Sequence, residues 1–266
     1  MIFYPKNSII PLISTYPKKT HKRITIKLLF LFPIIFIFTG CSYHKLNAAL
    51  NRTKEASYTA ITDPLTWGSA IGATALYMTY DDDITQHYMD HNIFDSDIDE
   101  TLRTINGVTM YSSAFFVKDD TTIDMTKRVL VDFTGSATAR FTTTTLNTLI
   151  KKKTPSGGDD YAIGSHHALD PFANSALTRR NVRDMSIPTW GKYTINTISY
   201  LSATGSAFAR VQEGGHSVAD QLVSVSIGNF IGLFFYEVFI PDNKELKSIK
   251  ANIDKNHFSI TANWNF

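Results

Sequence analysis

The sequence predicts an all-α protein, a helical bundle of one large domain or two small ones with a short strand-like tail. Long stretches such as 123–150 and 190–211 carry apolar residues at helical spacing. The alternation typical of strands is absent before the tail, where Phe258 to Phe266 predicts one short strand. A hydrophobic fraction of 43% over 266 residues is enough to form a core.

Local signals place the helices along the chain. Asp63 is a suitable N-cap for a helix over 65–80, with Pro64 at its first position. The segment 151–166 combines Lys, Pro, Gly and Asp and predicts a loop. Further helices are predicted from apolar stretches over 102–116, 123–150, 190–211 and 216–239.

The N-terminal segment predicts an exported protein. A basic start runs into the apolar stretch LLFLFPIIFIF at 28–38, which is shorter than the roughly 20 residues that a membrane-spanning helix needs. This pattern is typical of a signal peptide, here residues 1–40. Phe38-Thr39-Gly40-Cys41 resembles a bacterial lipobox, which implies that Cys41 is lipidated and becomes the new N-terminus. The alternative is a plain secretory signal followed by an incidental cysteine.

The remaining chain is predicted to have three parts: a polar tether over 41–60, the helical domain over 61–240 and the tail over 241–266. A lipid anchor would hold the domain at the periplasmic face of the bacterial envelope. Charge argues against nucleic acid as a partner. Six of the 26 basic residues lie in 1–40, which contains no acidic residue, so 20 basic residues face 24 acidic ones in the mature chain.

One polar constellation stands out in the otherwise small and apolar stretch GSAFARVQEGGHSVADQL. Arg210, His216 and Asp220 are six and then four residues apart. If a helix begins at His216, the histidine and Asp220 share one face, so the carboxylate can orient the ring and leave Nε2 free to attack or accept a proton. Arg210 offers donors that suit phosphate. A surface ion pair at a helix start is the alternative.

A second constellation, Ser165, His166 and His167, follows a glycine-rich loop. A histidine there can protonate a leaving oxygen as a general acid. Taken without the first constellation, His166 and His167 could be solvent-facing histidines in a loop, which is the alternative.

The two constellations together resemble the type 2 phosphatidic acid phosphatase superfamily, which includes bacterial acid phosphatases and vanadium haloperoxidases. Its third motif, S-R-x-x-x-x-x-H-x-x-x-D, matches Arg210, His216 and Asp220, with Ala209 in place of the serine. Its second motif, P-S-G-H, aligns with Gly164-Ser165-His166-His167. The element Asp63-Pro64-Leu65-Thr66-Trp67 looks like the family's Asp-Pro-x-x-Trp, so the resemblance covers about 61–240.

The resemblance implies a phosphatase of the acid phosphatase fold that forms a phosphohistidine. His216 would be the nucleophile, Asp220 would orient it, and His167 would protonate the leaving alkoxide and later activate water. The phosphate oxygens would be bound by Arg210, the Ser165 hydroxyl and the backbone N–H of His166. The substrate would be a phosphorylated lipid or a small phosphomonoester. The resemblance implies no cofactor and no metal, because cationic side chains supply the positive charge.

The family's first motif, K-x-x-x-x-x-x-R-P, is degraded. Asn147 and Thr154 occupy its lysine and arginine positions, although Pro155 is kept. We expect a lysine from 151–153 to substitute, with Lys151 best placed. The alternative is a weakened or inactive envelope lipoprotein on the same scaffold. A haloperoxidase is less favoured, since those enzymes use the charged first motif to hold vanadate.

A zinc site is a further alternative. His87 and His91 have i, i+4 spacing near Asp81, Asp82 and Asp83. The first histidine is not followed by the glutamate of the metalloprotease pattern, so a solvated segment is favoured.

Overall fold

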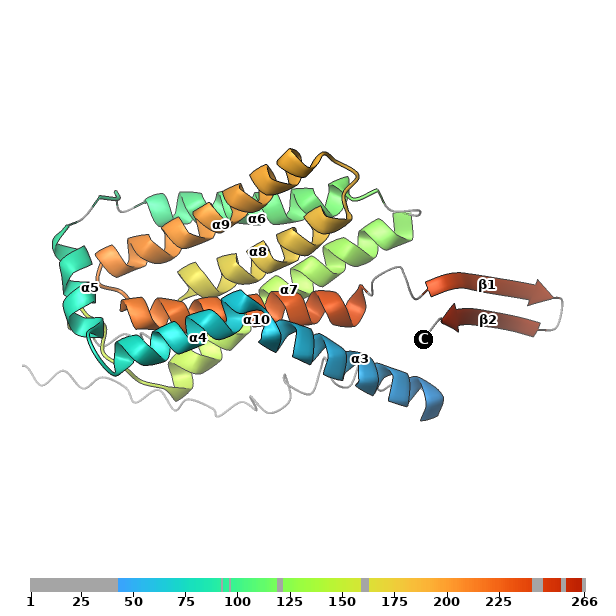
Figure 1. The fold of residues 1–266 in the computed structure, drawn as a ribbon, viewed down its shortest axis with the longest axis horizontal. Helices are drawn as coiled ribbons and strands as arrows, with labels where there is room; N and C mark the ends of the chain where they lie inside the picture. Colours follow the sequence, from blue (N-terminus) through green and yellow to red (C-terminus); the bar gives the residue numbers. More distant parts are fainter. Residues whose placement is uncertain are drawn as a thin grey trace, which may run out of the picture. The chain divides into compact units, whose positions relative to one another are not determined.

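The computed structural model describes residues 43–91, 93–95, 97–118, 122–158, 163–240, 246–254 and 257–264. It confirms the predicted all-α helical bundle (Figure 1). The chain divides into two compact units, residues 1–47 and 48–266, and the second contains nearly all of the described helices. The helices are α3 (Tyr43–Thr62), α4 (Pro64–Tyr77), α5 (Asp81–Asp90), α6 (Ile98–Phe116), α7 (Thr122–Leu149), α8 (His166–Asp184), α9 (Thr189–Gln212) and α10 (Val218–Phe239).

Helix α8 is the central element of the bundle. It packs against α6, α7, α9 and α10, and Figure 1 shows it running between them. Most of its residues are buried, polar ones such as Asp170, Asn174 and Asn181 included. A helix that is enclosed on every side must satisfy these polar groups inside the protein or with a ligand.

Helices α8 and α10 approach one another through glycine. A Cβ on Gly228 would collide with the backbone carbonyl of Leu169, and one on Gly232 with the carbonyl of Ala173. Added atoms at Gly232 would also lie 2.8 Å from Cβ of Ala176. The two backbones are therefore in direct contact, which no larger residue at either glycine would permit.

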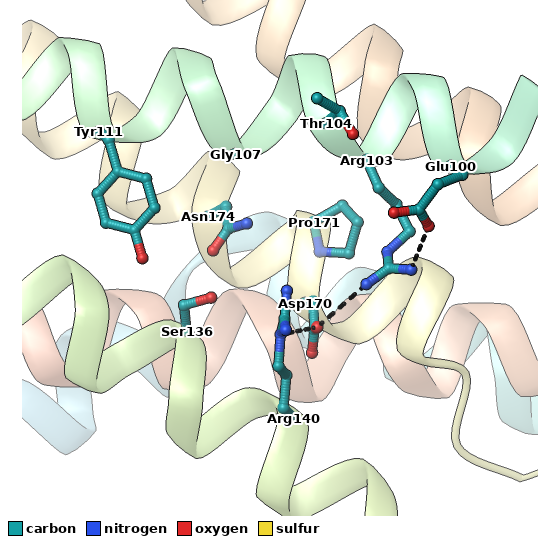
Figure 2. Close-up of a pocket in the computed structure, with 10 residues that line it drawn as sticks. All are labelled: Glu100, Arg103, Thr104, Gly107, Tyr111, Ser136, Arg140, Asp170, Pro171 and Asn174. Atoms are coloured by element: carbon teal, nitrogen blue, oxygen red, sulfur yellow. Dashed lines mark hydrogen bonds and ion pairs between the residues drawn. The ribbon is translucent and has the colours of Figure 1, made fainter.

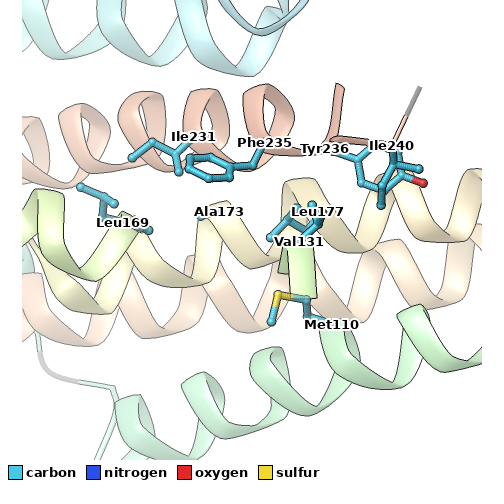
Figure 3. Close-up of a cluster of buried hydrophobic side chains, with 10 residues drawn as sticks. Met110, Val131, Leu169, Ala173, Leu177, Ile231, Phe235, Tyr236 and Ile240 are labelled. Atoms are coloured by element: carbon cyan, nitrogen blue, oxygen red, sulfur yellow. The ribbon is translucent and has the colours of Figure 1, made fainter. Parts of the chain in front are cut away.

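The largest apolar cluster surrounds this contact (Figure 3). Leu169 and Leu177 of α8 pack with Ile231 and Phe235 of α10, and Met110 of α6 closes the cluster. Burying a side chain of this size stabilises the fold by about 1.5–3 kcal/mol. This core fixes the axes of the helices whose ends carry the candidate site.

Several predicted boundaries are confirmed and others are wrong. The Asp63 carboxylate accepts a hydrogen bond of 3.1 Å from the Leu65 N–H, and Pro64 opens α4 as predicted. The predicted tether over 41–60 is instead mostly helix α3, where Ala56 and Ala60 are buried. The signal peptide and Cys41 lie outside the described residues.

The tail contains two strands where one was predicted. Strands β1 (Leu246–Asp254) and β2 (His257–Trp264) pair antiparallel, with Asp254 opposite His257 and Leu246 opposite Trp264. The pairing register shifts between Leu246 and Ser248. The prediction recognised the second strand and missed the first.

One helix among those described, α10, is long and apolar enough to cross a membrane by length and composition. It is also the helix in glycine-mediated contact with α8, and 56% of its apolar stretch is buried inside the protein. Its first turn carries Asp220, which is fully buried.

Candidate active site

The turn between α9 and α10 places Arg210 beside His216. Arg210 lies in the last turn of α9, and the chain reverses through Gly214, whose φ of +70° favours glycine. A Cβ on Gly215 would lie 2.8 Å from a terminal nitrogen of the Arg210 guanidinium. The pair of glycines therefore makes room for the arginine to lie against the turn. The guanidinium donates a hydrogen bond to the Glu213 carboxylate.

The expected helix start at His216 is wrong, because α10 begins two residues later at Val218. Ser217 is the N-cap and Asp220 completes a capping box, in which the Ser217 N–H donates to Asp220 Oδ2 at 3.0 Å. His216 precedes the cap and is 7% exposed. The two residues thus do not share a helix face, and the capping box accounts for part of the role of Asp220.

Asp220 also accepts hydrogen bonds from two side chains that lie far away in the sequence. The Tyr77 hydroxyl donates to Oδ1, and Lys152 Nζ lies 3.1 Å from each carboxylate oxygen. Burial, together with this hydrogen bond to the carboxylate, raises the pKa of Tyr77, so the phenol stays protonated. The carboxylate is held in place by three different elements of the fold.

The structure brings Lys152, rather than the expected Lys151, to this site. Besides Asp220, its ammonium contacts Ser217 Oγ at 3.3 Å and lies 4.7 Å from the centre of the Tyr77 ring. It is one third exposed and lies 3.9 Å from a carboxylate oxygen of Asp81. Of the lysines in 151–153, Lys152 thus contacts Asp220, and its role toward phosphate stays a prediction.

Asn147 and Thr154, the residues at the two lost charged positions, close the loop that carries Lys152. The Asn147 side-chain amide donates to the Gly164 carbonyl at 2.8 Å and accepts from the Gly164 N–H at 3.0 Å. Thr154 Oγ1 accepts from the Gly158 N–H at 2.9 Å. The Ser156 N–H then donates to the Gly214 carbonyl at 3.1 Å. This bond docks the loop on the turn that carries Arg210 and His216.

The first residues of α8 form the other side of the site. Ser165 is the N-cap and is fully buried, and its backbone N–H donates to Ser224 Oγ at 3.0 Å. Its hydroxyl has no hydrogen-bond partner among the described residues. The N-terminal N–H groups of a helix attract anions, so this end of α8 suits a phosphate.

His167 lies against a carboxylate that sequence reasoning missed. Its Nδ1 is 2.8 Å from Oδ2 of Asp99 in the first turn of α6, and Asp99 is 7% exposed. The sequence offers no signal for this contact, since Asp99 is one acid among many in a polar segment. The two atoms lie close but do not have hydrogen-bond geometry, so Asp99 lies against the ring without fixing its tautomer.

Positive charge gathers around this histidine. Burial, followed by the charges of Arg210 and Arg103, lowers the pKa of His167 to about 3. Partial burial, with Arg103 and Arg140, also lowers the pKa of His166. His167 is therefore a neutral base in the ligand-free protein.

Of the predicted residues, Arg210 and His216 lie close enough to His167 for their charges to lower its pKa. His87 and His91, weighed above as zinc ligands, lie with their ring centres 4.5 Å apart on and just after α5. Within the described ranges, no three His, Cys, Asp or Glu residues are grouped as a metal site.

Comparison with known proteins gives no relative. No family model matches the chain, and it matches neither a curated protein nor a solved structure. The fold and the site together therefore define only a class: an all-α bundle with a site that combines histidines, an arginine, a lysine and carboxylates.

Proposed function

We propose that this protein is a phosphoric ester hydrolase that forms a phosphohistidine at His216. The convergence of the predicted residues carries the proposal. Ser165 and His167 at the start of α8, and Arg210 and His216 in the α9–α10 turn, come together although more than 40 residues separate the two groups. Their resemblance to the type 2 phosphatidic acid phosphatase motifs adds the reaction type.

Two steps account for the reaction. In the first, an imidazole nitrogen of His216 attacks phosphorus, the phosphorus–oxygen bond to the alcohol breaks, and His167 gives the leaving alkoxide a proton. In the second, His167 takes a proton from water, whose oxygen attacks phosphorus and breaks the bond to His216. Free His167 is neutral. A phosphate anion bound beside the ring would raise its pKa and so supply the protonated form.

The remaining groups would hold the phosphate and orient the histidines. Arg210, Lys152 and the first N–H groups of α8 are the candidate donors to the phosphoryl oxygens. Asp99 would be the positioning residue for His167, because it contacts the ring nitrogen opposite the reacting one. Lys152, which is bonded to Asp220, would have to move from this carboxylate to the phosphate.

Location and substrate form part of the same proposal. A signal peptide over 1–40 and lipidation at Cys41 would place the enzyme at the periplasmic face of the envelope. Helix α3 begins at Tyr43, two residues after Cys41. A phosphorylated lipid or a small phosphomonoester would reach the site there.

A second candidate is an inactive envelope lipoprotein on the same scaffold. Asp220 is already bonded to Tyr77, Lys152 and the capping N–H, and Arg210 is bonded to Glu213. If these contacts persist with ligand, the phosphate charge is left without two of its cations. This candidate predicts vanadate binding without turnover.

The test is phosphate release by the purified protein from p-nitrophenyl phosphate, phosphatidate and isoprenyl pyrophosphate between pH 4 and 8. His216→Ala should reduce turnover to background and abolish acid-labile phosphate on the protein. His167→Ala should lower kcat by about 10²–10⁴. Lys152→Met should lower it by about 10²–10³ if it binds the phosphate.

Lys153→Met is the matched control, because this neighbour is exposed and should retain activity. Absence of phosphate release from all three substrates, with vanadate bound, would favour the inactive lipoprotein. Activity that survives His216→Ala would contradict the phosphohistidine.

A further inference from the structure

A pocket of about 180 Å³ opens beside the candidate active site, between α6, α7 and α8 (Figure 2). None of its residues has been assigned a role in phosphate chemistry above. The residues that line it are Glu100, Arg103, Thr104, Gly107, Tyr111, Ser136, Arg140, Asp170, Pro171 and Asn174. Figure 2 shows the hydroxyls of Tyr111 and Ser136 toward one end of the pocket and the charged side chains toward the other.

The charges in the pocket balance. Arg140 Nε lies 2.7 Å from Oδ2 of Asp170, and Arg103 bonds to Glu100 at 2.7 Å. Arg103 also lies 3.9 Å from Asp170. Two arginines therefore face two carboxylates, and the pocket has no net charge. An anion would gain from the arginines but would be repelled by both carboxylates.

Buried oxygen atoms of Asp170 and Asn174 at the pocket lack hydrogen-bond donors among the described residues. Asp170 is 2% exposed and Asn174 is 6% exposed, and Oδ1 of each has no hydrogen-bond partner among the described residues. A buried acceptor left without a partner costs about 1–3 kcal/mol. A bound molecule with hydroxyl groups would supply the missing donors. The same hydroxyls could accept from the arginines.

We propose that this pocket binds a small neutral polyhydroxyl group. Phosphate and other simple anions offer acceptors where Asp170 and Asn174 need donors, whereas a polyol offers both. The size is consistent with this choice. Since a water molecule occupies about 30 Å³, the pocket has the volume of about six waters. Drug-sized ligands need about 300–1,000 Å³.

The pocket lies next to His167, which links it to the proposed reaction. His167, Asp170, Pro171 and Asn174 have spacings of three, one and three residues, so they follow one face of α8. Arg103 likewise follows Asp99, the contact of His167, by one turn of α6. The pocket begins one turn beyond the histidine that would protonate the leaving oxygen. If the proposed function holds, on which this step rests, the polyol is the alcohol part of the phosphate ester.

Glycerol, which has six non-hydrogen atoms, is the first probe, in a ligand-observed NMR titration of the purified protein. Saturable binding by the unchanged protein is expected. Gly107→Leu should weaken it at least tenfold, because Gly107 lines the pocket and a side chain there enters open space. Asn174→Leu, which removes one of the two acceptors, should weaken it by a similar factor. Gly68→Leu is the control, since Gly68 also faces open space but lies on α4, away from the pocket.

Binding to glycerol needs no turnover, so its outcome is separate from that of the phosphatase proposal. Glycerol binding that is not saturable, or that Gly107→Leu leaves unchanged, overturns the inference whether or not the protein hydrolyses phosphate. If the protein is active, Gly107→Leu should raise KM for glycerol 3-phosphate at least tenfold and leave KM for methyl phosphate within twofold. Equal effects on both substrates would also overturn the assignment of the leaving alcohol.

Discussion

Each end of α8 has a carboxylate near arginines, but the two carboxylates differ in how many hydrogen bonds they accept. At the C-terminal end, Asp184 accepts hydrogen bonds from Tyr236 at 2.7 Å, Arg183 at 3.0 Å and Arg128 at 3.1 Å. Near the N-terminal end, Asp170 has one close cation, Arg140, and leaves Oδ1 without a donor. The same residue types thus form a closed network at one end and an incomplete one at the other.

Ionisation follows this difference. Burial raises the pKa of Asp184, but the hydrogen bonds from Tyr236 and Arg183 outweigh it, and the pKa is lowered overall. Burial also raises the pKa of Asp170, and Arg140 and Arg103 do not compensate, so that it reaches about 6. Perturbed carboxylates whose polar atoms lack partners are typical of sites that bind something. The comparison suggests that the C-terminal end serves the fold and the N-terminal end serves a ligand.

Asp184→Ala removes the carboxylate at the centre of the C-terminal hydrogen-bond network and should have the largest effect on stability. It removes the carboxylate that accepts hydrogen bonds from Tyr236, Arg183 and the Arg128 guanidinium, whose side chain is 6% exposed. We expect the free energy of unfolding to fall by about 3–5 kcal/mol, as when one partner of a buried ion pair is removed. Urea denaturation at pH 7 measures this. Asp82→Ala, at an exposed position of α5, should change it by less than about 0.5 kcal/mol, and equal losses in the two variants would refute the contrast.

Asp170→Asn tests the N-terminal carboxylate through the pH dependence of the free energy of unfolding. Because folding raises the pKa of Asp170 to about 6, the folded state binds its proton more tightly than the unfolded state. The stability of the natural protein relative to the variant should therefore fall as pH rises from about 4 to 6 and then level off. Above pH 6 the variant should be more stable by about 1–3 kcal/mol.

Urea denaturation of both proteins from pH 4 to 8 provides the difference curve. Asp132, whose pKa burial raises to about 7, and His167 are present in both proteins, so their contributions cancel. A difference that does not vary with pH would show that Asp170 ionises as an ordinary carboxyl group.

Arg140→Met should have the smallest effect. Its side chain is 63% exposed, so its pair with Asp170 is largely solvated on one side. Loss of an exposed ion pair typically costs less than about 1 kcal/mol. Urea denaturation at pH 7 in low and high salt measures this cost and its screening. A loss as large as that of Asp184→Ala would mean that both ends of α8 are held together in the same way.

The sequence predicted most of the bundle because helix signals are local. Asp63 and Pro64 open α4 as expected, since a cap and a fixed φ act within a few residues. Helices α3 and α8 escaped prediction. The polar composition of α3 hides a small buried face formed by Ala56 and Ala60, and α8 is rich in polar residues although most of the helix is buried. The start of α10 was misplaced by two residues because Ser217, and not His216, provides the cap.

The candidate site was only partly predictable. The spacing of Arg210 and His216 placed both in one turn, but the partners of Asp220 come from α4 and from the loop before α8. Which lysine of 151–153 reaches Asp220 depends on how Asn147 holds Gly164, a contact 17 residues apart. No sequence motif marks Asp99 as a contact of His167. Contacts of this kind are products of helix packing and leave no local pattern.

The glycine contact between α8 and α10 has a mechanical consequence. With the backbones touching at Gly228 and Gly232, neither helix can slide or rotate against the other without a steric collision. His167 at the start of α8 and Asp220 at the start of α10 therefore lie on two helices that are held in a fixed position relative to each other. A widening of the site that admits a ligand would then come from the elements around this pair, namely α6, α7, α9 or the loop that bears Lys152.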